Sequence, residues 1–437
     1  MTSVIVRRSK IHGNIRCPPS KSYTHRAIVV ASLAEGYSGI INFLSSRDTI
    51  ATIMGCKSFG VELNCESDMI KIIGKNNLEI PKNVIDVQNS GTTLRFLSAF
   101  AALTNDGYTV LTGDESIRRR PMQPMLSALN QLSVNCFSTR GNGMAPIIVR
   151  GGGMKGGNVI LSGGISSQFL SGLLISGVYS DSEIDIKVAD KQVSKPYIEA
   201  TLSTMRNFGV FVEHSPDYMH FRINPNKYSC ANFTIPADFS TGAILLSAGV
   251  LIGDKLILNG MNSSLPQGDS SIIDILDVMG ARIINDRQNN QVIVENSDHL
   301  DGGDFNLSDS PDLLPVVSIL AIKATSKVRI FGIEHTKYKE TDRVAVIVSE
   351  LRKLGIDCKS NDGDLIINPT KQLKNAILDP HHDHRLFMCF CIASMMTKKS
   401  IVHDADSVDV SFPSFINEMR KIGANIDDME INQTAEL

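Results

Sequence analysis

The stretch MRNFGVFVEHSPDYMHFRI, Met205 to Ile223, contains one complete copy of the pattern that decides the fold. The end of an amphipathic helix runs into Gly209, two apolar strand-like segments follow, and SPDY between them has the composition of a hairpin turn. A glycine directly after a helix is typical of a C-cap in the left-handed region, which other residues adopt at a cost. The stretch therefore predicts a helix, a C-cap and a β-hairpin, in that order.

The same pattern occurs six times along the chain. Its anchor residues are Gly60, Ser133, Gly209, Gly280, Gly355 and Gly423, at a spacing of about 70 residues. A unit of that length can hold two helices and several strands, so each copy is interpreted as an α/β module. Six modules can pair off or divide three and three, and typical domain size favours two domains of three modules. A cleft between two such domains is the default place for a ligand.

The composition is that of an ordinary soluble globular protein: 437 residues, 42% of them hydrophobic and 20% charged. The net charge of −3 argues against a general nucleic-acid or membrane-surface binder. Eight cysteines include no C-x-x-C pair, which favours reduced thiols over disulfides or a zinc site. The apolar runs are too short to span a bilayer, and no leader segment is recognisable, so we expect a cytoplasmic protein.

Cations occur where helices are expected to begin. In PPSKSYTHRA, Lys21 and Arg26 lie close to Ser20 and Ser22, either of which can cap a helix. A helix N-terminus carries partial positive charge, so cations there destabilise the helix unless an anion lies between them. The arrangement recurs in NSGTTLRF, KETDR and DHRLFM with Arg95, Arg343 and Arg385. Polar residues begin two further helices: Ser166, Ser167, Gln168, Ser194 and Lys195. Such helix starts form anion cradles, which predicts an enzyme or binder for small polyanions.

Each signal also has a simpler interpretation. A single arginine near a helix start is more often solvated, and the run Arg118–Arg120 alone has the composition of a solvated loop. HHDH, His381–His384, is a poor metal site because four adjacent residues cannot easily all face one ion. Carboxylates near the cations can serve as ion-pair partners or as general acids and bases. They are Asp312, Glu340, Asp342 and Asp383.

Taken together, the motifs resemble the enolpyruvyl transferase family, and among its members those that act on shikimate 3-phosphate. The segments PPSKSYTHRA, NSGTTLRF, RRRPM, SSQFLSGLL, VSKPYIEATL, LPQGD, SPDLLP, KETDR and DHRLFM occur in the family's order along essentially the whole chain. The resemblance implies an α/β fold of two inverse α/β barrel domains with three repeats each. It assigns residues 13–228 to one domain and residues 1–12 with 229–437 to the other, with the active site in the cleft between them. We expect a monomer.

The implied reaction transfers the enolpyruvyl group of phosphoenolpyruvate to the 5-hydroxyl of shikimate 3-phosphate by addition and elimination, releasing phosphate. This is a step of the shikimate pathway, and the resemblance implies neither a metal nor an organic cofactor. Asp312 is the candidate base and Glu340 the candidate acid, with Lys21 sharing the work. Matching positions assign to shikimate 3-phosphate Lys21, Ser22, Arg26, Ser166, Ser167, Gln168, Ser194, Tyr197, Asp312, His335 and Lys339. Those assigned to phosphoenolpyruvate are Lys21, Gly91, Thr92, Arg120, Gln168, Arg343 and Arg385.

The chain departs from the family pattern at several positions. Val410 stands where many members have a lysine that contacts phosphoenolpyruvate, and His335 where asparagine is common. Ser90 and Phe96 replace a usual alanine and proline. Two rival functions stay open: a UDP-N-acetylglucosamine enolpyruvyl transferase, and a non-catalytic polyanion-binding module. The first has Lys-Asn in place of Lys-Ser at positions 21 and 22, and the second has no need of the candidate acid and base.

Overall fold

The computed structural model describes residues 2–261, 264–361, 363–370 and 372–429. They divide into two compact units. The N-unit comprises Pro19–Pro236 and Leu265–Gln267, and the C-unit comprises Met1–Pro18, Ala237–Ser264 and Gly268–Leu437. The sequence analysis placed the boundaries after residues 12 and 228. They lie later because β2 (Ile11–Arg16) pairs with β15 (Gly253–Asn259), and β14 (Asn232–Thr234) pairs with β3 (Gly36–Ile41). The ends of the predicted second domain, residue 1 and residues 430–437, lie outside the described residues.

In its described part, the N-unit has three four-stranded sheets of the same topology. In each sheet the first two strands are parallel and the remaining pairs are antiparallel. The strand orders are β14-β3-β5-β4, β6-β7-β9-β8 and β10-β11-β13-β12. Bounds not yet given are β4 (Glu62–Cys65), β5 (Met69–Gly74), β6 (Ile85–Asp86), β7 (Tyr108–Thr112), β8 (Cys136–Ser138), β9 (Ile147–Arg150), β10 (Gly157–Leu161), β11 (Ile184–Val188), β12 (Glu213–His214) and β13 (His220–Ile223).

The described part of the C-unit repeats this topology three times. Its strand orders are β2-β15-β17-β16, β18-β19-β21-β20 and β22-β23-β1-β24. The remaining bounds are β1 (Ser3–Arg7), β16 (Ile283–Asp286), β17 (Gln291–Glu295), β18 (Gly303–Asn306), β19 (Val328–Phe331), β20 (Cys358–Asn361), β21 (Asp364–Ile367), β22 (Ile377–Leu378), β23 (Lys399–His403) and β24 (Ile426–Asp428). The predicted division of six repeats into two sets of three is confirmed.

The anchor residues of the repeat have the backbone conformation that the sequence predicts. Their φ angles are all positive: Gly60 83°, Ser133 65°, Gly209 83°, Gly280 70°, Gly355 86° and Gly423 107°. Positive φ lets the chain reverse from the helix into the hairpin, and Ser133 adopts it without being a glycine. The sixth hairpin is completed by the chain's beginning, since β24 pairs with β1 in the register Val6↔Ile426.

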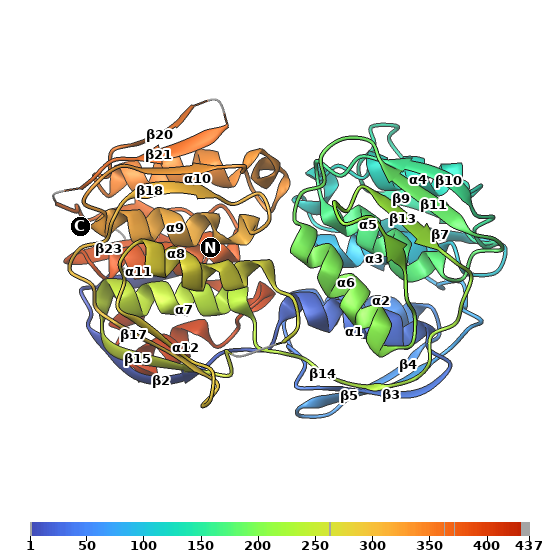
Figure 1. The fold of residues 1–437 in the computed structure, drawn as a ribbon, viewed down its shortest axis with the longest axis horizontal. Helices are drawn as coiled ribbons and strands as arrows, with labels where there is room; N and C mark the ends of the chain where they lie inside the picture. Colours follow the sequence, from blue (N-terminus) through green and yellow to red (C-terminus); the bar gives the residue numbers. More distant parts are fainter. Residues whose placement is uncertain (1, 262–263, 362, 371, 430–437) are drawn as a thin grey trace. The chain divides into compact units, whose positions relative to one another are not determined.

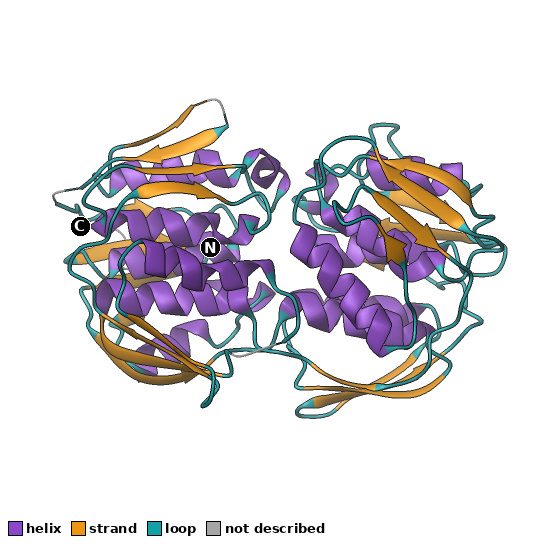
Figure 2. Cartoon of the chain, in the orientation of Figure 1, coloured by secondary structure: helices purple, strands orange, loops and turns teal. Residues whose placement is uncertain are grey.

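Helices lie on the inner side of the sheets in each unit, as an inverse barrel requires (Figures 1 and 2). The N-unit helices are α1 (Lys21–Leu33), α2 (Arg47–Ser58), α3 (Gly91–Ala101), α4 (Gln123–Gln131), α5 (Ser167–Gly177) and α6 (Lys195–Asn207). The C-unit helices are α7 (Phe239–Ile252), α8 (Ile272–Val278), α9 (Leu314–Leu320), α10 (Arg343–Lys353), α11 (His384–Ser394) and α12 (Phe415–Lys421). Every residue of α7 and α11 is buried, which agrees with the long apolar runs in these segments.

At two of the places where the chain passes between the units, a helix begins. In four repeats, the first strand of a sheet is followed along the chain by a helix and then by the second strand of the same sheet. The segment β6, α3 and β7 is an example. In contrast, β2 pairs in the C-unit and then leads into α1 of the N-unit, while β14 pairs in the N-unit and leads into α7 of the C-unit. The first residues of α1 and α7 therefore follow directly on the two crossing segments.

Candidate functional site

Three N-unit helices, α1, α3 and α5, begin with a serine N-cap. They follow strands β2, β6 and β10 along the chain. Ser20 accepts a hydrogen bond from the Tyr23 backbone N–H (3.5 Å), and Ser90 accepts one from the Thr93 N–H (3.3 Å). Ser166 accepts one from the backbone N–H of Gln168 (3.3 Å). Each cap satisfies one of the four N–H groups that a helix leaves without an intrahelical partner. The remaining backbone N–H groups in the first turns of α1, α3 and α5 can donate to an anion, as the sequence predicts.

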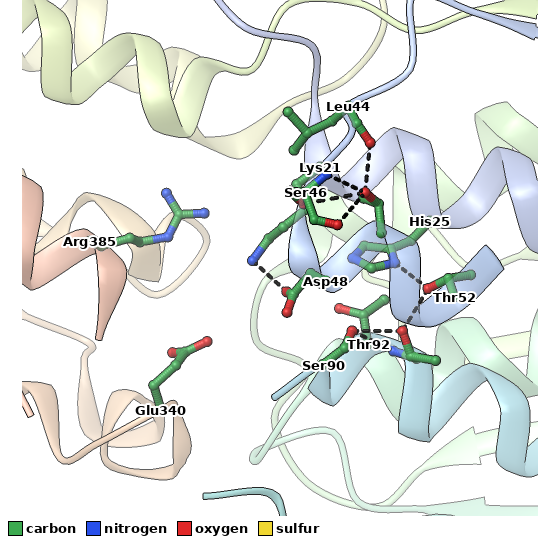
Figure 3. A network of polar contacts seen from close by, with 12 residues as sticks. Lys21, His25, Leu44, Ser46, Asp48, Thr52, Ser90, Thr92, Glu340 and Arg385 are labelled. Carbon is green, nitrogen blue, oxygen red and sulfur yellow. Dashed lines mark hydrogen bonds and ion pairs between the residues drawn. The ribbon is translucent and has the colours of Figure 1, made fainter. Parts of the chain in front are cut away.

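Lys21, the first residue of α1, forms an ion pair with Asp48 in the first turn of α2 (Figure 3). Its Nζ lies 2.9 Å from Asp48 Oδ2, and the two side chains are 12% and 6% exposed. Asp48 is not predicted from the sequence. An acidic residue in a first helical turn is common for electrostatic reasons alone, so only the packing of α1 on α2 reveals this pairing.

Arg26 is fully buried, and its guanidinium donates three hydrogen bonds to neutral oxygen atoms. Its Nε donates to Thr201 Oγ1 (2.8 Å), Nη1 to the Ser22 carbonyl oxygen (2.9 Å) and Nη2 to the Tyr197 carbonyl oxygen (2.9 Å). Burial lowers the pKa of Arg26 to about 10. The guanidinium also lies over the Phe96 ring, 5.5 Å from its centroid. The predicted residues Ser22, Arg26 and Tyr197 are therefore in contact, with Ser22 and Tyr197 contributing their backbones.

Gly91, the first residue of α3, lies against two guanidinium groups. A Cβ on Gly91 would lie 2.6 Å from Arg120 Nη1 and 2.8 Å from Arg95 Nη1, so a side chain here would displace both. Gln168 donates from Nε2 to Thr92 Oγ1 (3.0 Å), and its Oε1 accepts from Arg95 Nη1 (2.6 Å). Four predicted phosphoenolpyruvate residues are thereby brought together. Arg95 joins them, although the sequence analysis noted it only as a cation at a helix start.

The remaining predicted N-unit residues differ in their exposure to solvent. Arg118 and Arg119 are exposed, as the solvated-loop interpretation predicts, whereas Arg120 is only 6% exposed. Ser167 is the buried first residue of α5. Ser194 is buried directly before α6, with φ 56°.

Arg343, the first residue of α10, is the centre of an ionic cluster in the C-unit. Its Nε lies 2.7 Å from Asp383 Oδ2, Nη1 lies 2.6 Å from Asp312 Oδ1, and Nη2 lies 3.0 Å from Glu340 Oε2. The side chains of Arg343 and Asp383 are 1% and 0% exposed. Burial would lower the pKa of Arg343, but Asp383, Glu340 and Asp312 raise it well above its ordinary value. Arg343 therefore remains charged.

Asp312, in the short helix Pro311–Leu313, has three cationic neighbours. Besides Arg343, it contacts Arg385 (Oδ2 to Nη2, 3.1 Å) and Lys339 (Oδ1 to Nζ, 3.4 Å). Burial would raise the pKa of Asp312, but Arg385, Lys339 and Arg343 hold it well below its ordinary value. Burial also lowers the pKa of Lys339. The structure thus brings together five predicted residues and keeps Asp312 ionised: Asp312, Lys339, Glu340, Arg343 and Arg385.

Three further C-unit residues are also buried, and one of them, Asp269, is affected by the charges of the cluster. His335 is 4% exposed in the short helix Glu334–Tyr338, and Val410 is 2% exposed at the end of the short helix Ala405–Val410. Asp269 was not assigned from the sequence, although it ends the motif LPQGD. It is 2% exposed, and it accepts a hydrogen bond from the Ser240 hydroxyl. Burial, reinforced by the charge of Asp312, raises the pKa of Asp269 to about 6, against the opposing effect of Arg385.

The described residues contain no group of three or more His, Cys, Asp or Glu placed to hold a metal ion. His381 and His382, from the HHDH segment, lie near Asp379 and Asp404 respectively. No helix in the described ranges is long and apolar enough to cross a membrane.

The chain is similar to known proteins along nearly its whole length. Residues 5–419 match the family model described as EPSP synthase (3-phosphoshikimate 1-carboxyvinyltransferase). A 3-phosphoshikimate 1-carboxyvinyltransferase of Nitrosopumilus maritimus is 45% identical over 96% of this chain and 98% of its own. One from Methanocaldococcus jannaschii is 39% identical over 97% and 99%. Among solved structures, EPSP synthase from Acinetobacter baumannii superposes with a TM-score of 0.81 at 24% identity, over 98% of this chain and 100% of that one. The enolpyruvyl transferase NikO from Streptomyces tendae gives 0.78 at 16% identity, over 98% and 99%.

Proposed function

The chain belongs to the EPSP synthase (3-phosphoshikimate 1-carboxyvinyltransferase) family, and we propose that it transfers the enolpyruvyl group of phosphoenolpyruvate to the 5-hydroxyl of shikimate 3-phosphate. The observation that carries the proposal for this chain is the ionic cluster around Arg343. It holds two carboxylates, Asp312 and Glu340, among cations in a buried setting. A module that only bound polyanions would need no acid or base there, and the charge of these carboxylates would oppose binding of the ligand.

The proposal assigns shikimate 3-phosphate to residues of both units. Arg26 carries a buried charge among neutral partners, which suits an anionic ligand near the first turn of α1. Asp312, ionised by its neighbours, accepts a hydrogen bond from the substrate's hydroxyl. The full set is Lys21, Ser22, Arg26, Ser166, Ser167, Gln168, Ser194, Tyr197, Asp312, His335 and Lys339.

Phosphoenolpyruvate is assigned to the donors around Gly91 and to the two arginines of the ionic cluster. Guanidinium groups bind planar carboxylates and phosphates through paired hydrogen bonds, and the absent Cβ of Gly91 leaves room for Arg120 at the helix start. The set is Lys21, Gly91, Thr92, Arg120, Gln168, Arg343 and Arg385. Val410, where many members have lysine, contributes no charge to this set.

The proposed chemistry has two stages. In the addition, the 5-hydroxyl oxygen bonds to C2 of phosphoenolpyruvate and loses its proton towards Asp312, while Glu340 delivers a proton to the methylene carbon. In the elimination, the bond between C2 and the phosphate oxygen breaks, the leaving phosphate takes the proton held by Asp312, and the methyl group returns a proton to Glu340 as the double bond is restored. Lys21 supplies a positive charge near the reacting centre, which stabilises the charge that develops on the leaving phosphate.

Phosphate release tests the proposal. Purified protein given both substrates should release phosphate and form the enolpyruvyl product, whereas either substrate alone should give none. UDP-N-acetylglucosamine in place of shikimate 3-phosphate tests the sister activity and should also give none. Glu340→Gln should lower kcat by about 10²–10⁴, and Glu334→Gln, at an exposed carboxylate in the preceding short helix, should leave it intact. Turnover by Glu340→Gln at more than about a tenth of the wild-type rate would remove Glu340 as the acid.

We also propose that the protein works in the cytoplasm as a monomer. Eight free cysteines, six of them buried, suit a reducing compartment. Sedimentation equilibrium at micromolar concentration tests the oligomeric state, and fractionation of cells tests the location.

A further inference from the structure

A chain of hydrogen-bonding side chains joins the N-terminal halves of α1, α2 and α3 (Figure 3). His25 Nδ1 lies 2.6 Å from Thr52 Oγ1, which lies 2.6 Å from Thr93 Oγ1, which lies 2.6 Å from Ser90 Oγ. All four residues are 0% exposed. We call Thr52, Thr93 and Ser90 the hydroxyl chain. It has no place in the reaction scheme above, and it ends at the residue that caps α3.

The contact between His25 and the hydroxyl chain lies one helical turn after the Lys21–Asp48 ion pair, towards the C-terminal ends of α1 and α2. His25 follows Lys21 by four residues on α1, and Thr52 follows Asp48 by four residues on α2. Residues four apart lie on the same face of a helix, so the ion pair and the His25–Thr52 contact are successive links between the same two helices. Thr52 then extends the connection to the first turn of α3.

Helices α2 and α3 approach closely enough for this contact because α2 has a glycine at the crossing. A Cβ on Gly55 would lie 2.3 Å from Leu97 Cδ1 on α3. Gly55 lies one turn after Thr52, and Leu97 one turn after Thr93. The close approach and the hydrogen bond between the two threonines therefore belong to one packing arrangement.

The hydrogen-bond direction follows from the state of His25. Burial, together with the charges of Lys21 and Arg26, holds the pKa of His25 well below 6.5, so the ring is neutral and carries one N–H. Nε2 is buried without a hydrogen-bond partner. A fixed ring N–H there would have no acceptor, whereas a hydroxyl hydrogen can rotate towards one. The proton therefore belongs on Nδ1, which donates to Thr52, and each hydroxyl donates to the next as far as Ser90.

We propose that His25 and the hydroxyl chain are positioning groups, which hold the first turn of α3 in fixed register with Lys21 and so set the affinity for phosphoenolpyruvate. The first turn of α3 contains Gly91 and Thr92, which the proposed function assigns to that substrate, and the inference rests on that function. None of the four residues touches the substrate. They act through the helix start, because buried hydrogen bonds of fixed direction restrict how far α3 can shift or rotate against α1.

Matched substitutions test the proposal. Thr52→Val keeps the shape of the side chain but breaks the hydroxyl chain, whereas Thr52→Ser retains the hydroxyl. Thr204→Val is the control, since Thr204 is equally buried but its hydroxyl donates to the Ala200 carbonyl of its own helix α6 (2.8 Å). We expect Thr52→Val to raise the KM for phosphoenolpyruvate about tenfold, with kcat and the KM for shikimate 3-phosphate within about twofold of wild type. Thr52→Ser should restore the KM, and Thr204→Val should leave all three constants unchanged.

The state of His25 gives a readout that does not depend on activity. In protein labelled with 15N-histidine, the His25 resonances should report a neutral ring with the hydrogen on Nδ1, and Thr52→Val should alter the Nδ1 signal. A hydrogen on Nε2, or an unaltered KM in Thr52→Val, would overturn the proposal, as would equal KM changes in Thr52→Val and Thr204→Val. If the wild-type protein shows no turnover with the two substrates, the proposed function fails, while the resonances still decide the hydrogen-bond direction.

Discussion

Two fully buried arginines have opposite surroundings in the two units. Arg343 in the C-unit contacts three carboxylates, which raise its pKa well above the ordinary value. Arg26 in the N-unit donates to a threonine hydroxyl and two carbonyl oxygens, and burial lowers its pKa to about 10. Arg343 therefore has its counter-ions within the protein, whereas Arg26 carries a desolvated charge stabilised by neutral hydrogen-bond acceptors and the Phe96 ring.

The difference indicates separate tasks for the two regions. The C-unit cluster keeps Asp312 ionised, which suits a group that accepts a proton, and it places Glu340 in the same cluster. The N-unit offers serine-capped helix starts, hydroxyls and cations, which suit an anionic ligand. Substitutions of the cluster carboxylates should therefore affect turnover or folding, and those at the N-unit helix starts should affect binding, with Lys21 affecting the rate as well.

The largest expected effect is on turnover, at Glu340. Glu340→Gln keeps the size of the side chain and a hydrogen-bond acceptor for Arg343 but cannot deliver a proton. General acids contribute about 10²–10⁴ in rate, so kcat should fall by that factor while shikimate 3-phosphate still binds. Steady-state kinetics and calorimetric titration measure the two quantities. A variant that kept more than about a tenth of the wild-type kcat would make Glu340 a structural partner of Arg343, with Lys21 the next candidate for the acid.

The two buried arginines should differ in their contribution to stability. Arg343→Met leaves the fully buried Asp383 carboxylate without its recorded cation, and it should lower the free energy of unfolding by about 3–5 kcal/mol. Arg26→Met leaves only neutral acceptors and should cost about 1–3 kcal/mol. Urea denaturation of both variants measures the difference. Adding Asp383→Asn to Arg343→Met should recover part of the loss. Equal losses for the two arginines would contradict the proposed contrast in their surroundings.

Lys21 and Arg118 compare a paired, mostly buried cation with an exposed one. Lys21→Ala removes the charge beside Asp48 at the start of α1, where a donor to a developing anion is worth about 100-fold in rate or more. Arg118→Ala removes a solvated loop cation and should change kcat/KM by less than about threefold. Comparable losses in kcat/KM would show that the general positive charge of the region, rather than the place of Lys21, matters.

Asp269 gives the smallest expected effect, which depends on pH. Its pKa rises from 3.8 to about 6 on folding, so its contribution to stability is fully present below pH 3.8 and is lost as the pH rises through 6. Asp269→Asn lacks this dependence but can still accept the hydrogen bond from Ser240. Between pH 5 and pH 8 the variant should therefore gain about 1 kcal/mol relative to wild type. Thermal unfolding of both proteins at the two pH values measures the change, and a constant difference in melting temperature would exclude the assigned titration.

The fold was largely predictable because its signals are local. A left-handed C-cap after a helix and a hairpin after the cap depend on neighbouring residues, so the repeated pattern predicted six modules and their positive-φ anchors at Gly60, Ser133 and the others. The boundaries between the units were less predictable. Strands β2 and β14 each pair with a sheet in one unit and lead into a helix of the other, and pairing between distant strands leaves no mark in a local pattern.

The sequence also identified most cations of the candidate site, because each stands at a helix start with its own cap and apolar run. It could not identify their partners. That Lys21 meets Asp48, that Arg343 meets Asp383 and that Arg95 reaches Gln168 depend on which helices pack together. The sequence alone therefore determined the repeated module, its caps and the positions of the charges. The tertiary structure decided which charges are neutralised within the protein and which are buried among neutral groups, because ionisation depends on distance and burial rather than on order along the chain.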